Sequence, residues 1–79
     1  MIIVSMLDRK AGFDTIQLAI NEGTASRAFA YAMNNGGIPE YAPADFELYK
    51  VGEFDQKTGK IEAIFPPVMI CSGQDVIGK

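Results

Sequence analysis

The sequence contains no histidine and no tryptophan, and Cys71 is the only cysteine among its 79 residues. The absence of histidine removes the side chain on which most hydrolases and zinc sites depend. One cysteine cannot form an intrachain disulfide, so a disulfide-stapled secreted scaffold is excluded and a reducing cytoplasm is expected.

Basic residues are scarce as well. Lysine and arginine number 7 against 10 aspartates and glutamates, which gives a net charge of −3. Proteins that coat nucleic acid without sequence preference are usually basic, so this charge argues against a simple coating role. The apolar run at residues 1–4 is too short for a signal-peptide core or a membrane span, and no membrane partner is expected.

The sequence does contain enough apolar material for one folded core. Hydrophobic residues make up 48% of the chain, and its length suits a single domain over residues 1–79. Because so small a domain buries only a modest share of its surface, dimerisation is a natural way to bury more. We therefore expect a homodimer.

The clearest local pattern lies in residues 46–61. Phe46, Leu48 and Tyr49 belong to a run with the bulk that strands favour, and residues 55–60 are polar, as in a turn. Gly59 can take a positive φ at the corner of that turn. From Ile61 onward apolar residues roughly alternate with polar ones, which predicts a β-hairpin.

The N-terminal third of the sequence predicts one strand and leaves a second segment open to two interpretations. Residues 2–7 form an apolar run typical of a buried strand. Residues 11–14 are expected to form a loop. Residues 15–20 alternate only partly, so they are interpreted as either a short strand or an extended arm.

A helix is predicted over residues 24–34. Thr24 is a suitable N-cap, because its hydroxyl can accept a hydrogen bond from an amide of the first turn. Residues 34–37, with two glycines, are expected to end the helix. Apolar residues at helical spacing predict one buried stripe, formed by Ala25, Ala28, Phe29, Ala32 and Met33.

The C-terminal half is punctuated by prolines. Residues 38–45 are interpreted as a connector, with a tight turn at residues 43–45 leading into the hairpin. Residues 65–67 are expected to end the second hairpin strand, because proline cannot donate to a ladder. Residues 68–71 are predicted to form an edge strand and residues 72–79 a mobile tail. The fold class is α+β, a small antiparallel sheet with one amphipathic helix on one face, in the order strand, possible strand, helix, strand, strand.

No catalytic residues, cofactor or metal ligands are predicted, and the protein is not expected to be an enzyme. The carboxylates are scattered singly, whereas acid–base catalysis by a carboxylate pair needs two neighbouring groups. Cys71 has no histidine to activate it. Neither glycine-bearing turn matches a phosphate-binding loop.

Candidate nucleic-acid contacts combine basic and aromatic side chains, as in single-strand binders. The alternative is that these charges are solvated turn residues and that the aromatics belong to a core or a dimer contact. The candidates are Arg9, Lys10, Arg27, Tyr31, Tyr49, Lys50, Lys57 and Lys60.

The predicted sheet carries apolar residues on both faces, and one short helix can cover only one of them. The second face is then a candidate surface for a homodimer or another partner. Alternatively, the loop that holds Phe13 and Ile16, or the C-terminal tail, folds over it.

Together these segments resemble a known family. The most specific part is the run at residues 48–55, Leu-Tyr-Lys-Val-Gly-Glu-Phe-Asp, with Thr58-Gly59 in the following turn. Over about residues 1–67 the chain is similar to the small nonstructural proteins of microviruses, the gokushovirus-like single-stranded DNA phages. The resemblance implies a role in viral DNA replication, in genome synthesis or its coupling to packaging, in the cytoplasm of the infected bacterium. It supplies no catalytic motif to place on this chain.

Two functions follow from the residues and the resemblance. In the first, which the genome type favours, a dimeric accessory factor binds single-stranded DNA, and the basic side chains must converge on one face. In the second, an adaptor binds a host or phage replication protein. The adaptor would expose an apolar patch ringed by Glu47, Glu53 and Glu62, with the basic residues dispersed.

Overall fold

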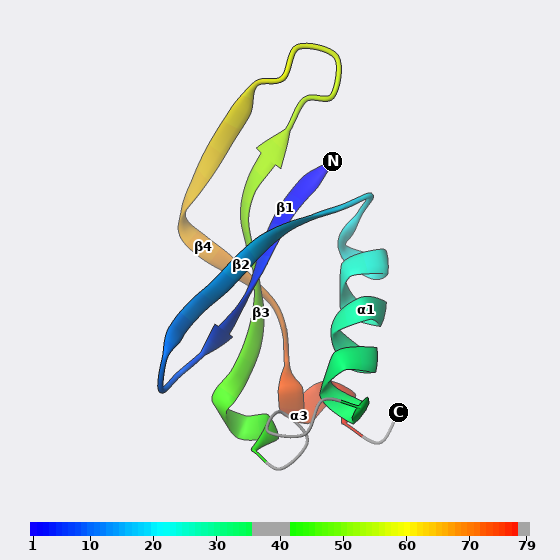
Figure 1. Ribbon diagram of the computed structural model, residues 1–79, viewed down its shortest axis with the longest axis vertical. Helices are drawn as coiled ribbons and strands as arrows, with labels where there is room; N and C mark the ends of the chain where they lie inside the picture. The colour runs from blue at the N-terminus through cyan, green and yellow to red at the C-terminus, as the bar shows by residue number, and fades with distance from the viewer. Residues whose placement is uncertain (36–41, 78–79) are drawn as a thin grey trace.

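The computed structural model describes residues 1–35 and 42–77, and it shows a four-stranded antiparallel sheet with a helix on one face (Figure 1). This architecture agrees with the predicted α+β class. The spatial order of the strands is β2-β1-β3-β4. The elements are β1 (Ile2–Asp8), β2 (Gly12–Ala19), α1 (Glu22–Asn35), the 3₁₀ turn η1 (Pro43–Asp45), β3 (Phe46–Phe54), β4 (Ile61–Ser72) and α3 (Gly73–Val76).

The strand β1 lies inside the sheet, paired with β2 on one edge and with β3 on the other. Its apolar run therefore has a physical reason, because a strand with neighbours on both edges loses most of its contact with water. Ile2, Ile3 and Val4 are all buried. The two strands at the edges of the sheet are β2 and β4.

The core lies between α1 and one face of the sheet. Met33 is completely buried, and α1 also contributes Ala25 and Phe29. Ala28 and Ala32, which the predicted stripe included, are exposed. The buried stripe of the helix is therefore narrower than predicted. The sheet contributes Ile2, Val4, Phe46 and Leu48 to this core.

The helix begins two residues earlier than predicted, because Asn21 rather than Thr24 caps it. The Asn21 Oδ1 atom accepts a hydrogen bond from the Thr24 backbone N at 2.9 Å. In return, the Thr24 Oγ1 atom accepts one from the Asn21 backbone N at 3.2 Å. Thr24 thus takes the third helical position of a reciprocal cap. At the other end α1 extends to Asn35, and the glycines expected to stop it, residues 36–37, lie outside the described residues.

The predicted hairpin is confirmed. β3 and β4 flank a polar turn in which Gly59 has a φ of 79°. The Asp55 carboxylate accepts a hydrogen bond from the Lys57 backbone N at 2.9 Å, and this bond lowers the pKa of Asp55. The predicted turn before the hairpin is also present, as η1. Residues 38–41 of the predicted connector lie outside the described residues.

Two strands are longer than predicted. β2 starts at Gly12, inside the expected loop, and includes residues 15–19 of the segment interpreted as a strand or an extended arm, whereas residue 20 lies beyond its end. β4 continues through Pro66 and Pro67, where its end was expected. An edge strand tolerates proline, and the β3–β4 register shifts between Lys50 and Gly52. This shift leaves residues 64–67 of β4 outside the regular ladder, so the prolines need not donate to it.

The segment after β4 packs against the core instead of forming the expected tail. The Ser72 backbone N donates a hydrogen bond to Asp75 Oδ2 at 3.2 Å, which starts the short helix α3. Val76 and Ile77 pack against the core cluster. The Asn34 Nδ2 atom of α1 also donates to the Val76 carbonyl oxygen at 3.0 Å. Residues 72–77 of the predicted tail thus lie in or directly after β4 and α3, and residues 78–79 lie outside the described chain.

Candidate functional site

The face of the sheet that points away from α1 carries mainly apolar side chains, and we call it the open face. Directly paired residues of neighbouring strands lie on the same face of a sheet. The strand register therefore defines four rows across the open face: Phe54 and Ile61; Leu18, Ile3, Gly52 and Ala63; Ile16, Ser5, Tyr49 and Met69; and Phe13, Leu7, Glu47 and Ser72.

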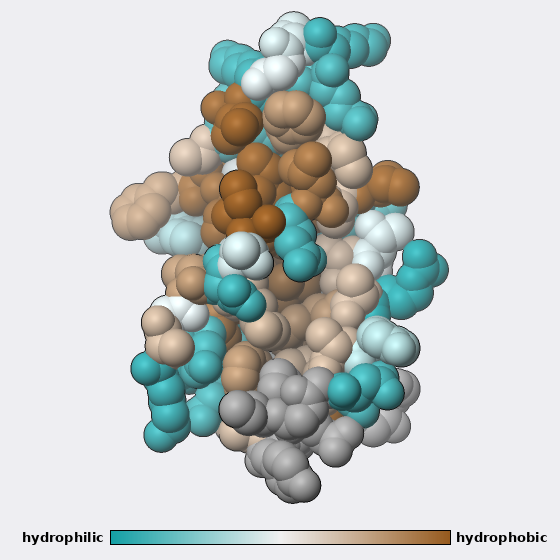
Figure 2. Space-filling model, viewed as in Figure 1, coloured by the Kyte–Doolittle hydropathy of each residue, from teal (hydrophilic) through white to brown (hydrophobic). Residues whose placement is uncertain are grey.

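Large apolar side chains on the open face are exposed to solvent. The exposed fractions are 49% for Phe13, 65% for Ile16, 52% for Leu18, 64% for Ile61 and 50% for Met69. Figure 2 shows hydrophobic side chains gathered around β2 and toward the end of the sheet that carries the β3–β4 turn. A hollow of about 260 Å³ on this face is lined by Ile3, Ile16, Gln17, Leu18, Phe54 and Ile61. A contiguous apolar surface of this kind is typical of an association site.

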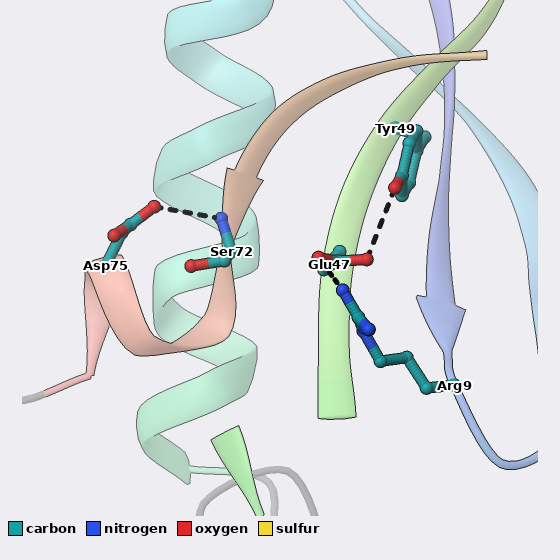
Figure 3. Close-up of polar contacts among 5 residues, drawn as sticks. All are labelled: Arg9, Glu47, Tyr49, Ser72 and Asp75. Atoms are coloured by element: carbon teal, nitrogen blue, oxygen red, sulfur yellow. Dashed lines mark hydrogen bonds and ion pairs between the residues drawn. The ribbon is translucent and has the colours of Figure 1, made fainter. Parts of the chain in front are cut away.

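A polar cluster closes one end of the open face (Figure 3). Arg9 Nη2 donates to Glu47 Oε2 at 2.8 Å, and the Tyr49 hydroxyl donates to Glu47 Oε1 at 3.2 Å. The Tyr49 ring packs edge-on against Phe13, with their centroids 5.6 Å apart. The hydrogen bond to Glu47 and its negative charge raise the pKa of Arg9. Burial raises the pKa of Tyr49, and the charge of Glu47 raises it further.

The raised pKa of Tyr49 predicts a loss of stability in alkali. The folded state holds the phenol proton more tightly than the unfolded state, so this contribution is complete below the ordinary tyrosine pKa of 10.0 and is lost as the pH rises through the folded-state pKa. We expect the free energy of unfolding of Tyr49→Phe to fall less between pH 9 and about pH 11 than that of the wild type. Urea denaturation of both proteins at each pH measures this difference, and equal pH slopes would contradict it.

Two pairs of basic candidates lie at opposite ends of the sheet. Arg9 and Lys10 follow β1, whereas Lys57 and Lys60 lie in the turn between β3 and β4 (Figure 1). Because β1 and β3 are antiparallel, the whole length of β3 separates the two pairs. Nine residues of strand span roughly 30 Å. Part of this charge is also compensated, since Arg9 binds Glu47 and Lys60 Nζ lies 3.5 Å from Glu62 Oε1.

The remaining candidates lie on different surfaces. Arg27 and Tyr31 are exposed on α1. Arg27 lines a hollow of about 420 Å³ between α1 and β2. Lys50 pairs with Val4 and therefore lies on the helix side of the sheet, while Tyr49 lies on the open face. One copy of the chain thus does not bring the basic and aromatic candidates to one face.

The apolar residues of the open face were not predicted as site residues. One alternative from the sequence places Phe13 and Ile16 in a loop that folds over the second face, whereas in the structure both belong to β2 and form part of that face. The partial alternation of these apolar residues with polar ones is the sequence pattern that could have indicated a strand with one apolar face. A register shift between Ser5 and Leu7 breaks the strict two-residue period and obscures it.

In the described part of the chain, the potential metal ligands are dispersed and the cysteine is partly buried. No group of three or more His, Cys, Asp or Glu side chains that could hold a metal ion occurs within residues 1–35 and 42–77. Cys71 Sγ lies 3.9 Å from Ser26 Oγ, and burial raises the pKa of its thiol. A raised pKa lowers the fraction of reactive thiolate at neutral pH. No helix in this part of the chain has the length and apolar character needed to cross a membrane.

Comparison with known proteins places the chain in a phage family. No match is found among curated proteins or among solved structures. The family model described as phage ORF5 protein matches residues 1–76. Since this match covers nearly the entire sequence, the chain belongs to the phage ORF5 protein family.

Proposed function

We propose that this phage protein is a nonstructural accessory factor of viral single-stranded DNA replication, in genome synthesis or its coupling to packaging. It acts in the cytoplasm of the infected bacterium as an adaptor for a host or phage replication protein, and it has no catalytic activity. The observation that carries the adaptor role is that the chain exposes apolar surface suited to protein association, on the open face and in the hollow beside α1, while its basic residues are dispersed over several surfaces.

Two similarities of the sequence support this role in phage infection and DNA replication. Membership of a phage family supports a function during infection. The resemblance of residues 48–55 and the Thr58-Gly59 turn to the microvirus nonstructural proteins supports the assignment to single-stranded DNA replication.

The charges of the chain favour protein binding over DNA coating. A coating protein gains its affinity by neutralising many phosphates along one track. This chain has a net charge of −3, and its basic pairs at the two sheet ends are roughly 30 Å apart along β3. Arg9, at one end of the open face, already binds Glu47 at 2.8 Å. The apolar surface therefore offers more binding free energy to a protein than the basic residues offer to DNA.

The replication role can be tested in a phage that carries an early stop codon in the gene for this chain. We expect fewer viral single strands per double-stranded intermediate in infected cells, measured by strand-specific quantitative PCR. The wild-type chain supplied from a plasmid should restore the ratio, and so should the triple variant Lys10→Ala, Lys57→Ala, Lys60→Ala. An unchanged ratio in the stop mutant would overturn the replication role.

Direct binding of single-stranded DNA is the second candidate, and one observation favours it. Phe13 and Tyr49 form an aromatic pair on the open face, close to the turn that holds Arg9 and Lys10. Bases can stack on exposed aromatic rings beside basic side chains.

We expect a labelled single-stranded oligonucleotide to show no rise in fluorescence anisotropy with micromolar protein, even at low salt. The dispersed charges leave too few phosphate contacts for binding at that concentration. Micromolar affinity that weakens steeply with salt, and that Lys10→Ala and Tyr49→Ala both reduce, would instead establish the second candidate.

A further inference from the structure

The open face lacks a cover in the described chain. A stable domain buries each apolar face of a sheet against another layer. α1 covers one face, and α3 lies on that same side, because Val76 and Ile77 join the core cluster around Phe29 and Met33. No other described helix is available to cover the second face.

The chain exposes more surface than is expected of a folded monomer of its size. A folded monomer of 8.6 kDa is expected to expose about 4,700 Å². The structure exposes 5219 Å². The surplus is on the order of 500 Å². Five large apolar side chains of the open face, each about half exposed or more, contribute to the exposed surface: Phe13, Ile16, Leu18, Ile61 and Met69. With a polar rim, such a patch approaches the roughly 800 Å² per partner of a standard interface.

The charges of the open face suit a second copy of the same chain. A two-fold interface brings the same surface of both copies together, so each surface must be compatible with itself. The charged side chains that the described structure places on the open face are Arg9 and Glu47, and these form an ion pair. The acidic net charge therefore lies elsewhere, and two open faces can meet without strong like-charge repulsion.

We propose that the open face is the interface of a homodimer in which two copies pack sheet against sheet. The rows that contain Ile16, Leu18 and Ile61 interdigitate across a layer about 10 Å thick, as in a β-sandwich. Each α1 lies on the outside of this dimer. The hollow between α1 and β2, lined in part by Arg27 and Ala28, stays accessible in both copies and offers the adaptor a site for its replication partner.

Light scattering coupled to size-exclusion chromatography tests this interface. We expect the molar mass of the wild-type protein at micromolar concentration, measured by light scattering, to be twice the 8.6 kDa of one chain. Ile16→Glu should elute as a monomer, with a dimer dissociation constant raised at least about 100-fold, because the dimer would bury two unpaired carboxylates. Ile16 is largely exposed in one copy, so its replacement should leave the far-ultraviolet circular dichroism unchanged. Met69→Glu tests the same face from β4.

Tyr31→Glu is the matched control. Tyr31 is also a large, exposed side chain, but it lies on α1, on the other side of the sheet from the open face. This variant should remain a dimer. A monomeric wild type, an assembly larger than a dimer, or a dimer that Ile16→Glu and Met69→Glu leave intact would each overturn the proposal. A monomeric wild type would leave the replication role standing, because the phage assay tests that role separately.

Discussion

Met33→Ala is expected to destabilise the protein by about 2–5 kcal/mol, the range for removing a large apolar side chain from a core. Met33 is completely buried and belongs to the cluster that joins α1 to the sheet. Its Cε atom also approaches α3, since a Cβ atom built on Gly73 would lie 2.6 Å from it. Small domains have a total stability near the lower end of about 5–15 kcal/mol, so this one change should remove much of it.

Urea denaturation followed by circular dichroism measures this loss. Both proteins must be compared at the same concentration, because the stability of the proposed dimer would depend on protein concentration. Tyr31→Ala is the control on the same helix: Tyr31 is 73% exposed, and alanine is the better helix former. We expect the control to change stability by no more than about 0.5 kcal/mol. A Met33→Ala protein within that same margin would contradict the packing of α1 against the sheet.

The elements that could be predicted from the sequence are those whose signal is local. The β3–β4 hairpin is specified by its own residues, because the turn hydrogen bonds and the positive φ of Gly59 all lie within residues 55–60. Three of the five residues predicted for the helix stripe, Ala25, Phe29 and Met33, are buried as expected.

The sequence-based predictions differ from the structure in elements whose conformation depends on tertiary contacts. β4 can pass through two prolines only because it lies at an edge of the sheet, and strand order is not encoded in any short segment. β2 begins inside an expected loop because Gly12, at a φ of 102°, lets the chain turn directly into the strand. The packing of α3 could not be predicted, because its sequence is largely polar and its attachment depends on the contact of Val76 and Ile77 with the core.

The candidate site shows the same division. The alternation of side chains along a strand places Tyr49 and Leu48 on opposite faces of the sheet, so the sequence predicts a second face with apolar side chains. Which residues make up that face could not be predicted, because Phe13, Ile16 and Leu18 reach it through the pairing of β2 with β1. The basic candidates were grouped by residue type, and only the antiparallel topology reveals that Lys10 and Lys57 lie at opposite ends of the sheet.

Gly73→Ala is expected to be the second strongly destabilising change. Gly73 is buried where β4 leads into α3. A Cβ atom at this position would press on the Pro43 carbonyl oxygen, lie 2.6 Å from Met33 Cε and come within 3.2 Å of the Phe46 carbonyl oxygen. Met33 could adjust, but the two carbonyl groups belong to the backbone of η1 and β3. We therefore expect a cost toward the upper end of the 1–3 kcal/mol typical of overpacking.

Gly23→Ala is the control for this experiment. A Cβ atom there would lie 3.3 Å from a side-chain atom, Asn21 Oδ1, and the exposed first turn of α1 gains from alanine. Its effect should range from neutral to a stabilisation of about 1 kcal/mol. The pair of variants separates two descriptions of the C-terminal segment. In a loose tail, alanine at residue 73 would meet nothing and cost nothing, so an unchanged free energy of unfolding for Gly73→Ala would restore the tail predicted from the sequence. A loss that Gly23→Ala does not share would mean that α3 is part of the folded core.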